Sequence, residues 1–384
     1  MNFLYISPDF PINYQLFTQN LARLGVQVYG LGESPFYSLP ENIRESLRWY
    51  EQVDLRDTQA VINSVTGMFN QVPDLRAFDV AESHNEYWLE LEATLNSHFS
   101  IPGITAGHIA HWKRKSLMKE SFVGGGIPVA RGALIPTLPE AFTLARDLSY
   151  PVIIKPDSGV GGNGVHLIHN EEDLTTIFPT LDEPYIMEEY IRGGIQTYDG
   201  LTDHDGNVIY ESSLNLSHGI LDYIKGQDIA FHSTRTIPDE LRDLGRRVVS
   251  IFGIQRKFFH FEFFKRGDTY LPIEINARPP GGPILDLMNY AMDSDLYLHY
   301  ATMIRDNRAQ IPSEKKYCCA YLSRKGGKYS LSHEEIMEKH GASLVEYTEN
   351  HPLYWKAMGQ YRYIFRSPSE NDLLGIMEDV LRKP

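Results

Sequence analysis

The stretch from Phe258 to Gly282 constrains the fold of this chain more than any other part of the sequence. Apolar and polar residues alternate on both sides of a short turn at 266–268, which is the pattern of two antiparallel strands. Because side chains alternate with a period of two, Glu274, Asn276 and Arg278 share one face of the second strand. The hairpin is therefore expected to have one buried face and one charged face.

The charged face carries two glutamates that are expected to lie opposite each other. With the turn centred on Asp268, Glu262 and Glu274 stand the same number of positions from the turn, so they pair across the two strands. Opposed carboxylates repel, so this pairing favours a bound cation. Oxygen ligands suit Mg²⁺, which keeps several waters and is shared with substrate phosphates. The alternative is an exposed hairpin with two ordinary surface glutamates.

Composition places the chain among globular proteins built from several units. Its 384 residues exceed one compact core and suggest about two to four structural units. The sequence is 42% hydrophobic and 22% charged, which excludes a disordered chain. The formal net charge of −14 argues against nucleic-acid binding, which needs a basic footprint, but allows a small phosphate ligand.

The terminal sequence and the cysteines favour a cytoplasmic protein. The first residues lack the basic region of a signal peptide and soon meet Pro8 and Pro11. No run of about 18 apolar residues occurs, so no membrane span is expected. Cys318 and Cys319 are adjacent, so a disulfide between them would be strained, and a reducing compartment is expected.

Residues 1–108 alternate between strand-like and helix-like segments, which predicts an α/β unit with a parallel sheet. The first strand–helix turn, 7–11, contains no glycine, so it does not suit the pyrophosphate of a nicotinamide dinucleotide. Glu82, Ser83 and His84 follow the carboxyl end of a predicted strand, where open α/β sheets place ligands. An ordinary loop explains these three residues as well.

A glycine-rich loop between two predicted strands is the second strong feature. The strand 150–156 carries Lys155 near its end, four glycines follow within Gly159 to Gly164, and 165–168 form the next strand. Such a loop brings backbone N–H groups close to phosphate oxygens. A Walker loop or a dinucleotide turn would open a helix instead. We therefore predict a glycine flap over a nucleotide. The alternative is a flexible hairpin tip, which leaves Lys155 unexplained.

The remaining segments frame these two features. The basic stretch 108–122 is predicted to be helical, and its lysines are typical of a solvated face. The strand 185–191 ends in a glycine turn, and its edge offers backbone groups to a purine. A helix over 239–252 leads into the hairpin, and 285–304 is predicted as one helix. Pro312 and the charged residues after it mark a boundary.

The order of Lys115, Lys155 with its flap, and the Glu262–Arg278 motif resembles the ATP-grasp superfamily. The resemblance is closest to its carboxylate–amine ligases and biotin-carboxylase-like members, and it spans roughly residues 1–310. It implies a multi-lobed α/β and α+β fold. The implied units are a Rossmann-like N-terminal (pre-ATP-grasp) domain, a small subdomain with the flap, a large subdomain with the metal site and a C-terminal αβ module, at 1–108, 109–187, 188–312 and 313–384.

The resemblance also implies a role for each motif residue. The two lysines contact the ATP phosphates under the flap, a glutamate meets the adenine amine, neighbouring backbone groups hold the base, and a glutamine meets the ribose. The implied nucleotide-binding residues are Lys115, Lys155, Ser158, Gly161, Gly162, Glu188, Glu189, Ile191 and Gln196. The implied ligands of one or two Mg²⁺ ions, which Mn²⁺ can replace, are Glu262, Glu274 and Asn276, while Arg278 stabilises charge on the transferred phosphoryl group.

Two positions depart from the family pattern. Arg114 stands where many members have an aspartate before the first lysine. Gln196 stands where many have a ribose-binding glutamate, and glutamine can still hydrogen-bond a hydroxyl. These departures bear on nucleotide affinity and preference rather than on the use of ATP.

The resemblance implies an ATP- and Mg²⁺-dependent ligase. Phosphoryl transfer converts a carboxylate, a poor electrophile, into an acyl phosphate, which an amine then attacks to give an amide, ADP and phosphate. The flap and the lobes would exclude water from the intermediate. Two alternatives stay open, namely bicarbonate activation of the biotin-carboxylase type and a non-catalytic ATP-binding sensor.

The sequence does not identify the substrates. His218, His232 and Arg235 lie between the nucleotide and metal motifs and can reach a substrate carboxylate, although ordinary surface or core positions are the commoner case. The expected partners are a small-molecule carboxylate and amine, with neither nucleic acid nor membrane. Since dimers are the commonest oligomers, a homodimer is the default expectation.

Overall fold

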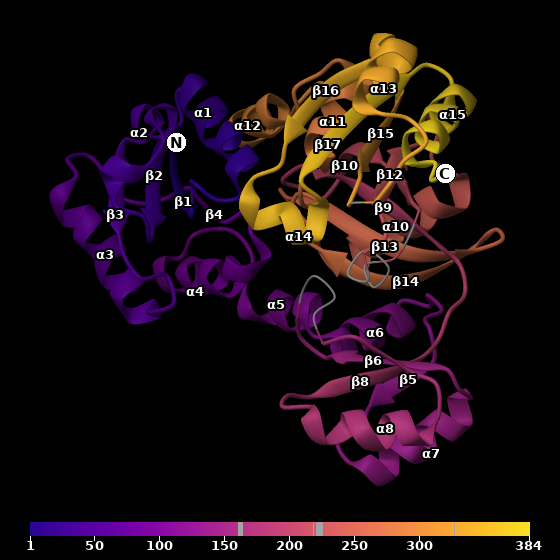
Figure 1. The fold of residues 1–384 in the computed structure, drawn as a ribbon. Coiled ribbons are helices and arrows are strands. Elements are labelled where there is room, and N and C mark those ends of the chain that lie inside the picture. Colours follow the sequence, from indigo (N-terminus) through magenta and orange to yellow (C-terminus); the bar gives the residue numbers. More distant parts are fainter. Residues whose placement is uncertain (160–163, 218, 220–225, 326) are drawn as a thin grey trace.

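The computed structural model describes residues 1–159, 164–217, 219, 226–325 and 327–384, which form three β-sheets (Figure 1). The N-terminal sheet is parallel, as predicted, with strand order β3-β2-β1-β4. Helices surround its strands, and its core is apolar. Its elements are β1 (Asn2–Ile6), α1 (Gln15–Arg23), β2 (Gln27–Gly32), α2 (Glu41–Ser46), β3 (Trp49–Gln52), α3 (Thr58–Gln71), β4 (Val80–Glu82) and α4 (Leu89–Phe99).

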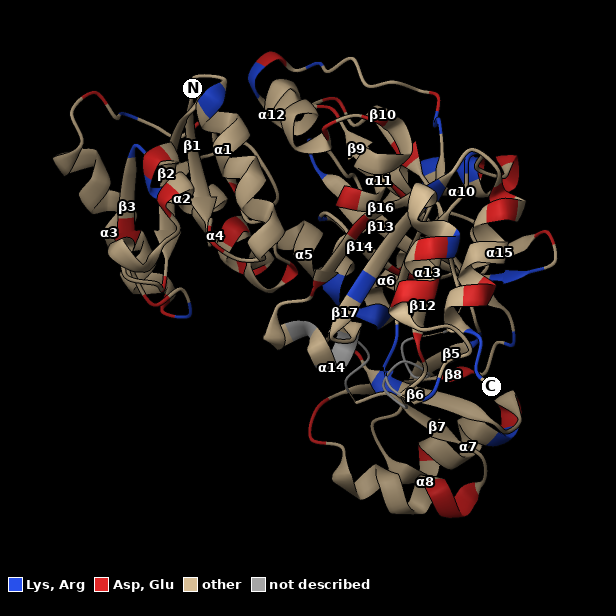
Figure 2. Ribbon diagram, turned by 45° about the horizontal axis from the view of Figure 1, so that its top comes forward, with Lys and Arg blue, Asp and Glu red and all other residues tan. Residues whose placement is uncertain are grey.

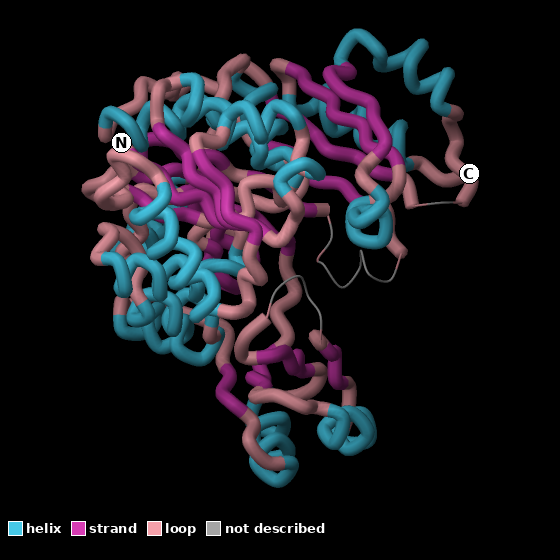
Figure 3. The backbone as a smooth tube through the Cα atoms, turned by 90° about the vertical axis from the view of Figure 1, so that its left-hand side faces the viewer, coloured by secondary structure: helices cyan, strands magenta, loops and turns pink. Residues whose placement is uncertain are grey.

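A small antiparallel sheet of order β5-β8-β6-β7 forms a separate lobe. Two helices cover the face of this sheet that points away from the rest of the molecule (Figures 1 and 3). The other face is turned toward the large sheet. The elements are β5 (Gly132–Leu134), α7 (Leu138–Leu148), β6 (Val152–Pro156), β7 (His166–Ile168), α8 (Glu171–Ile177) and β8 (Tyr185–Glu189).

The largest sheet has nine strands and runs β14-β13-β9-β11-β12-β15-β17-β16, with β10 paired to β9. All its neighbouring strands are antiparallel. β14 and β13 lie at the end nearest the small lobe in Figure 1, and Figure 2 shows the same sheet from a direction turned by 45°. The strands are β9 (Gly194–Thr202), β10 (Val208–Ser212), β11 (Leu214–Leu216), β12 (Ile229–Ser233), β13 (Phe258–Arg266), β14 (Thr269–Asn276), β15 (Cys318–Ser323), β16 (Leu344–Glu349) and β17 (Tyr361–Ser367).

The hairpin predicted from alternation is β13–β14. Glu262 pairs with Glu274 as predicted, and a register shift follows between Glu262 and Phe263. Pro272 lacks an N–H donor, and β14 tolerates it because β14 is an edge strand. The phenylalanine face of β13 is buried under α6 (Lys115–Gly124) and α10 (Asp239–Ile251). The opposite, charged face of the hairpin is not covered by these two helices, and it carries the predicted site residues.

The stretch predicted as one helix at 285–304 is two helices, α11 (Ile284–Met292) and α12 (Leu296–Asp306). Asp293 adopts a left-handed backbone conformation, with φ of 52°, that ends α11. Asp295 then caps α12, because its side chain accepts the N–H of Leu298 at 3.1 Å. The apolar periodicity of the sequence continues across this break, which explains why the sequence predicts a single helix here.

Strand pairing crosses two of the predicted domain limits. The limit between 187 and 188 falls inside β8, which pairs with β5 and β6 of the small sheet. The segment 313–384 contributes β15, β16 and β17 to the nine-stranded sheet, because β15 pairs directly with β12. The C-terminal segment therefore extends the large sheet. None of the described helices has both the length and the apolar character that a membrane-spanning helix needs.

A buried ion cluster joins the N-terminal lobe to the large sheet. Lys257 Nζ lies 2.7 Å from Glu82 and 2.8 Å from Glu92, and the hydroxyl of Tyr300 donates to Glu82 at 3.0 Å. One ammonium cannot fully offset two buried carboxylates. Burial raises the pKa of Glu92 to about 7, and the charge of Glu82 adds to this effect while Lys257 opposes it.

We expect Glu92→Gln to remove a pH dependence of stability. An unfolded glutamate titrates near 4.5, whereas folded Glu92 holds its proton to about pH 7. Wild-type stability relative to the variant should therefore fall as pH rises between these values, by up to about 1.4 kcal/mol per pH unit. Urea denaturation of both proteins at several pH values measures this difference.

Glu90→Gln provides the control on the same helix, since the Glu90 side chain is 68% exposed. Its stability relative to wild type should stay nearly constant over the same pH range. A pH-independent difference between wild type and Glu92→Gln would contradict the assignment.

Candidate active site

Two lysines and a glutamate form a buried cluster on the inner face of the small sheet. Lys155 on β6 and Glu188 on β8 are 7% and 8% exposed, and their charged groups lie 2.7 Å apart. Lys119 of α6 approaches the other carboxylate oxygen of Glu188 at 2.8 Å. Burial would raise the pKa of Glu188, but the two ammonium groups outweigh it and hold the pKa below its usual value. Glu188 is therefore ionised, and its remaining lone pairs can accept further hydrogen bonds.

The start of α6 is fixed to the strand that precedes the glycine loop. Asp157, 3% exposed, accepts hydrogen bonds from the Ser116 N–H at 2.7 Å and from Arg114 Nε at 3.0 Å. Its backbone oxygen accepts the N–H of Lys115 at 2.7 Å. The Lys115 ammonium donates to the Gly159 carbonyl at 3.1 Å. Arg114, which departs from the family pattern, thus helps to hold Lys115 beside the loop.

Glu262 and Glu274 lie side by side on the charged face of the hairpin. Burial raises the pKa of Glu274, and the charge of Glu262 raises it further. The amide of Asn276 reaches Glu274 at 3.5 Å. Among the described residues, no three His, Cys, Asp or Glu side chains are grouped as a metal site. Two carboxylates and one amide oxygen still fit Mg²⁺, because this ion takes its other ligands from water and phosphates.

The two sheets bring their charges together at this face. Burial lowers the pKa of Lys115, and the charges that act on it next are Glu274, Lys155 and Glu86. Glu274 in turn is affected by Lys115 and Lys155. The predicted phosphate-binding lysines and the predicted metal-binding glutamates therefore lie within electrostatic range of one another, as a clamp on a metal-bound polyphosphate requires.

His260 was not among the predicted site residues, although it shares a face with Glu262 in the sequence pattern. Its Nδ1 contacts Asp199 at 2.5 Å, and its Nε2 contacts Glu262 at 3.3 Å. Thr197 also donates to Asp199. Burial would lower the pKa of His260, but Asp199 and Glu262 raise it to about 10. A charged imidazolium therefore steadies Glu262.

Arg278 is held by a residue of the N-terminal lobe. Its guanidinium donates to Glu86 at 3.0 and 3.2 Å and to the Pro279 carbonyl at 2.9 Å. It also reaches the side-chain oxygen of Asn276 at 3.4 Å. Glu86 was not predicted. The available signal was its place just after β4, since open α/β sheets bind ligands at the carboxyl ends of their strands.

Gln196, which was predicted to contact a ribose, lies on the phenylalanine face of the large sheet rather than on the charged face. Gln196 is 1% exposed, donates to the Ser213 hydroxyl at 3.0 Å and accepts from the Tyr270 hydroxyl at 3.2 Å. It pairs with Phe263, whereas Thr197 pairs with Glu262. Alternation therefore turns Gln196 to the phenylalanine face of the sheet, away from the charged face.

The other predicted base-binding residues lie at the end of β8, which closes with Glu189, and just after it, at Ile191. The Glu189 carboxylate accepts the N–H of Arg131 at 2.7 Å, and Ile191 is 8% exposed. Both line a cavity of about 340 Å³, together with residues before β6 and Arg266. Ser158 is exposed at the start of the glycine loop. Gly161 and Gly162 lie outside the described residues.

Of the three candidate substrate residues, the two that the structure describes, His232 and Arg235, make their printed contacts outside this cluster. His218 lies outside the described residues. His232 contacts Glu370 at 3.3 Å, and Arg235 donates to the carbonyls of Lys315 and Pro368 at 3.1 Å. His232 and Arg235 thus contact residues at and beyond the predicted boundary after Pro312, which agrees with ordinary structural roles.

Comparisons with known proteins bear on the same part of the chain. Residues 114–278 match the family model described as the ATP-binding domain of the carbamoyl-phosphate synthase L chain. The C-terminal section of the carbamoyl phosphate synthase large chain from Methanopyrus kandleri is 26% identical over 175 residues. This match covers 40% of the present chain and 30% of the relative, so the chain spans under a third of that relative's length.

Solved structures resemble almost the whole chain. An L-amino acid ligase from Bacillus licheniformis gives a TM-score of 0.76 at 15% identity, covering 99% of this chain and 96% of that chain. The biotin carboxylase domain of the Hydrogenobacter thermophilus 2-oxoglutarate carboxylase, solved with MgADP and bicarbonate, gives 0.67 at 16% identity, covering 95% and 86%. The chain has the ATP-grasp fold. The predicted resemblance to the ATP-grasp superfamily is therefore confirmed.

We expect Asp157→Asn to destabilise the start of α6. The substitution removes the ion pair with Arg114 and weakens a buried acceptor, which should cost about 1–3 kcal/mol. Urea denaturation measures the loss. Asp147→Asn is the control, because the Asp147 side chain is 73% exposed and lies 3.8 Å from its only described ion partner. Equal stability of the two variants would contradict the anchoring role of Asp157.

Proposed function

We propose that this chain is an ATP- and Mg²⁺-dependent ligase that activates a carboxylate as an acyl phosphate for attack by an amine. The proposal rests on the charged face of the small sheet lying near the charged face of the β13–β14 hairpin. Lys155 and Glu188 stand on the small sheet, while Glu262 and Glu274 stand opposite each other on β13 and β14. The match of residues 114–278 to an ATP-binding domain supports it independently.

The nucleotide would lie between the two sheets. Lys115 and Lys155 would bind its phosphates, with Ser158 and the glycines at 161 and 162 covering them. Glu188 would accept from the adenine amine, and the backbone at 189 and 191 would hold the edge of the base. This placement needs no contact from Gln196, whose side chain faces the other side of the sheet.

The residues that would hold Mg²⁺ are Glu262, Glu274 and Asn276, and Mn²⁺ has the same ligand preference. A bound cation would supply charge neutralisation at the phosphates. The protein itself contributes orientation. The imidazolium of His260 holds Glu262, and Glu86 holds Arg278 beside Asn276. Arg278 would then stabilise charge on the transferred phosphoryl group without reorganising.

The reaction would proceed in two displacement steps. A carboxylate oxygen attacks the γ-phosphorus, and the bond to the ADP oxygen breaks, so an acyl phosphate and ADP result. The amine nitrogen then attacks the acyl carbon, inorganic phosphate leaves and the amine releases a proton. Burial of Lys155, Glu188 and Asn276 indicates a site that excludes water, which would otherwise hydrolyse the acyl phosphate.

Bicarbonate is the second candidate substrate. The carbamoyl phosphate synthase relative and the biotin carboxylase neighbour, which was solved with bicarbonate, favour it. The L-amino acid ligase favours a carboxylate and an amine, because its structure covers almost all of this chain at a TM-score of 0.76. We therefore rank the carboxylate–amine reaction first. We place the enzyme in the cytoplasm and propose a homodimer, which the biotin carboxylase neighbour, solved as a domain dimer, also supports.

A substrate panel tests the proposed reaction. ADP release is measured with Mg²⁺ and ATP in the presence of pooled amino acids, and separately with bicarbonate. We expect stimulation by an amine–carboxylate mixture, with an amide detected by mass spectrometry. Stimulation by bicarbonate alone would establish the second candidate. Absence of stimulation by either would contradict a ligase and favour an ATP-binding sensor.

Glu274→Gln tests the metal assignment with little change in side-chain size. It removes one of two facing carboxylates, so we expect Mg²⁺-dependent turnover to fall about 100-fold or more. Asp268→Asn in the exposed turn of the same hairpin serves as the control and should retain activity. Wild-type turnover in Glu274→Gln would contradict the metal site.

A further inference from the structure

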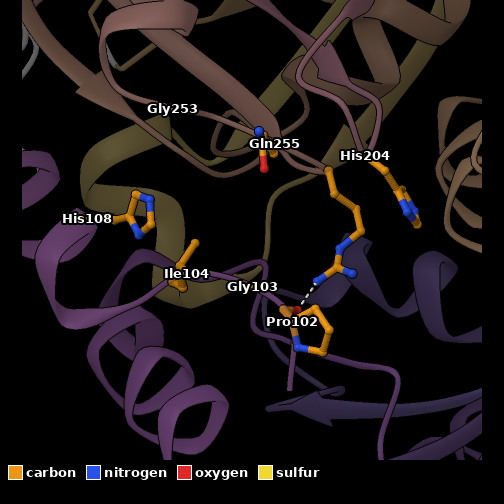
Figure 4. A pocket seen from close by; sticks show the side chains of 8 residues that line it. Pro102, Gly103, Ile104, His108, His204, Gly253 and Gln255 are labelled. Atoms are coloured by element: carbon orange, nitrogen blue, oxygen red, sulfur yellow. Dashed lines mark hydrogen bonds between the residues drawn. The ribbon is translucent and has the colours of Figure 1, made fainter. Parts of the chain in front are cut away.

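A second cavity, of about 200 Å³, lies away from the charged face of the hairpin. Three separate segments line it. Residues 102–104 precede α5 (Ala106–Lys113) and His108 lies in its first turn. His204 belongs to the turn between β9 and β10, while Gly253, Gln255 and Arg256 lie between α10 and β13. Figure 4 shows His108 and His204 on opposite sides, with Gln255, Gly103 and Ile104 between them.

The lining is basic and polar although the whole chain is acidic. One arginine, two histidines and a glutamine line the cavity, and none of the described residues that line it is Asp or Glu. The formal net charge of the chain is −14. The acidic surface elsewhere on the protein does not attract anions. A concave site with basic side chains is therefore suited to bind an anion.

His108 presents a hydrogen-bond donor at the wall of this cavity. Its Nδ1 accepts the backbone N–H of Thr105 at 3.1 Å, so in the neutral ring the proton resides on Nε2. That Nε2 lies next to Gly253, since a Cβ added at Gly253 would stand 3.9 Å from it. His108 Nε2–H is therefore a fixed donor on one side of the cavity.

Arg256 places its guanidinium across the same space. Nη2 donates to the Pro102 carbonyl at 2.5 Å, and the Arg256 N–H donates to the Asp203 carbonyl at 2.7 Å. Throughout the described part of the chain, no carboxylate lies within 4 Å of this guanidinium. The Asp203 side chain is occupied by the N–H groups of Asp205 and Asn207. The charge of Arg256 is therefore available to a ligand.

His204 adds an unsatisfied polar atom on the opposite side. Its Nε2 is buried and has no hydrogen-bond partner among the residues that the structure describes, while its backbone N–H donates to Asn307 at 3.1 Å. Buried polar atoms without a partner are rare and call for an explanation. Gln255 is exposed and lines the cavity, so its side-chain amide can add a further donor.

We propose that this cavity binds a phosphate group, either as free inorganic phosphate or as a small phosphate monoester. A tetrahedral oxyanion can accept from the Arg256 guanidinium, His108 Nε2–H and the Gln255 amide at once. The volume is below the range of about 300–1,000 Å³ typical of drug-sized ligands, so a whole nucleotide is not the occupant.

The site is placed to affect how the N-terminal lobe sits on the large sheet. Arg256 is followed by Lys257, whose ammonium lies 2.7 Å from Glu82 and 2.8 Å from Glu92. A ligand that bridges Arg256 and His108 would tie the connection after the N-terminal lobe to the start of β13. Binding to the folded form alone would then raise the melting temperature.

Titration calorimetry of the full chain with inorganic phosphate, at constant ionic strength set by chloride, tests the proposal. Gln255→Glu places a negative charge in the cavity at an exposed position, so the dissociation constant should rise about tenfold. Gln71→Glu, which makes the same charge change at another exposed position, should leave the dissociation constant unchanged. Arg256→Gln should abolish binding.

Lys115→Met separates this cavity from the proposed nucleotide site. Phosphate affinity that survives in Lys115→Met and is weakened in Gln255→Glu supports the proposal. The proposal would be overturned if phosphate affinity were lost in Lys115→Met and unchanged in Gln255→Glu. It would also be overturned if the wild-type protein did not bind phosphate at millimolar concentration. A parallel titration with glycerol phosphate shows which form of phosphate the cavity binds. If glycerol phosphate binds more tightly than inorganic phosphate, the ligand is a monoester, and if it binds more weakly, the ligand is free phosphate.

Discussion

The repulsion between Glu262 and Glu274 is the constraint on which the site depends. Two carboxylates opposed across β13 and β14 destabilise the hairpin unless positive charge compensates them. The structure supplies part of that charge through His260, Lys115 and Lys155. In the proposed function, a cation with phosphates would supply the remaining positive charge.

Long-range contacts set the geometry of this charged face. Asp157 fixes the start of α6, so Lys115 faces the glycine loop, and Glu86 fixes Arg278 from a different lobe. The buried ion cluster of Lys257 with Glu82 and Glu92 holds the N-terminal lobe against the large sheet. Each anchor is a charged group paired in a buried or half-buried position, where the loss of one partner is costly. The proposed ligase therefore depends on all three lobes being docked together.

The local features of the site could be predicted from the sequence, and the contacts between distant segments could not. The pairing of Glu262 with Glu274 follows from alternation and turn position alone. Motif order does not give the face of a strand, so it could not show that Gln196 lies on the phenylalanine face while its neighbour Thr197 lies on the charged face. Glu86 and Asp157 were missed because their partners lie 192 and about 41–43 positions away. Such pairs leave no periodic signal.

The central claim is that the carboxylate of the substrate passes through an acyl phosphate. The most direct test uses a carboxylate labelled with ¹⁸O and follows the released inorganic phosphate by ³¹P NMR. The account predicts that one ¹⁸O atom moves into the phosphate at each turnover, because the carboxylate oxygen attacks phosphorus and leaves with it. Amide formation with unlabelled phosphate would contradict it.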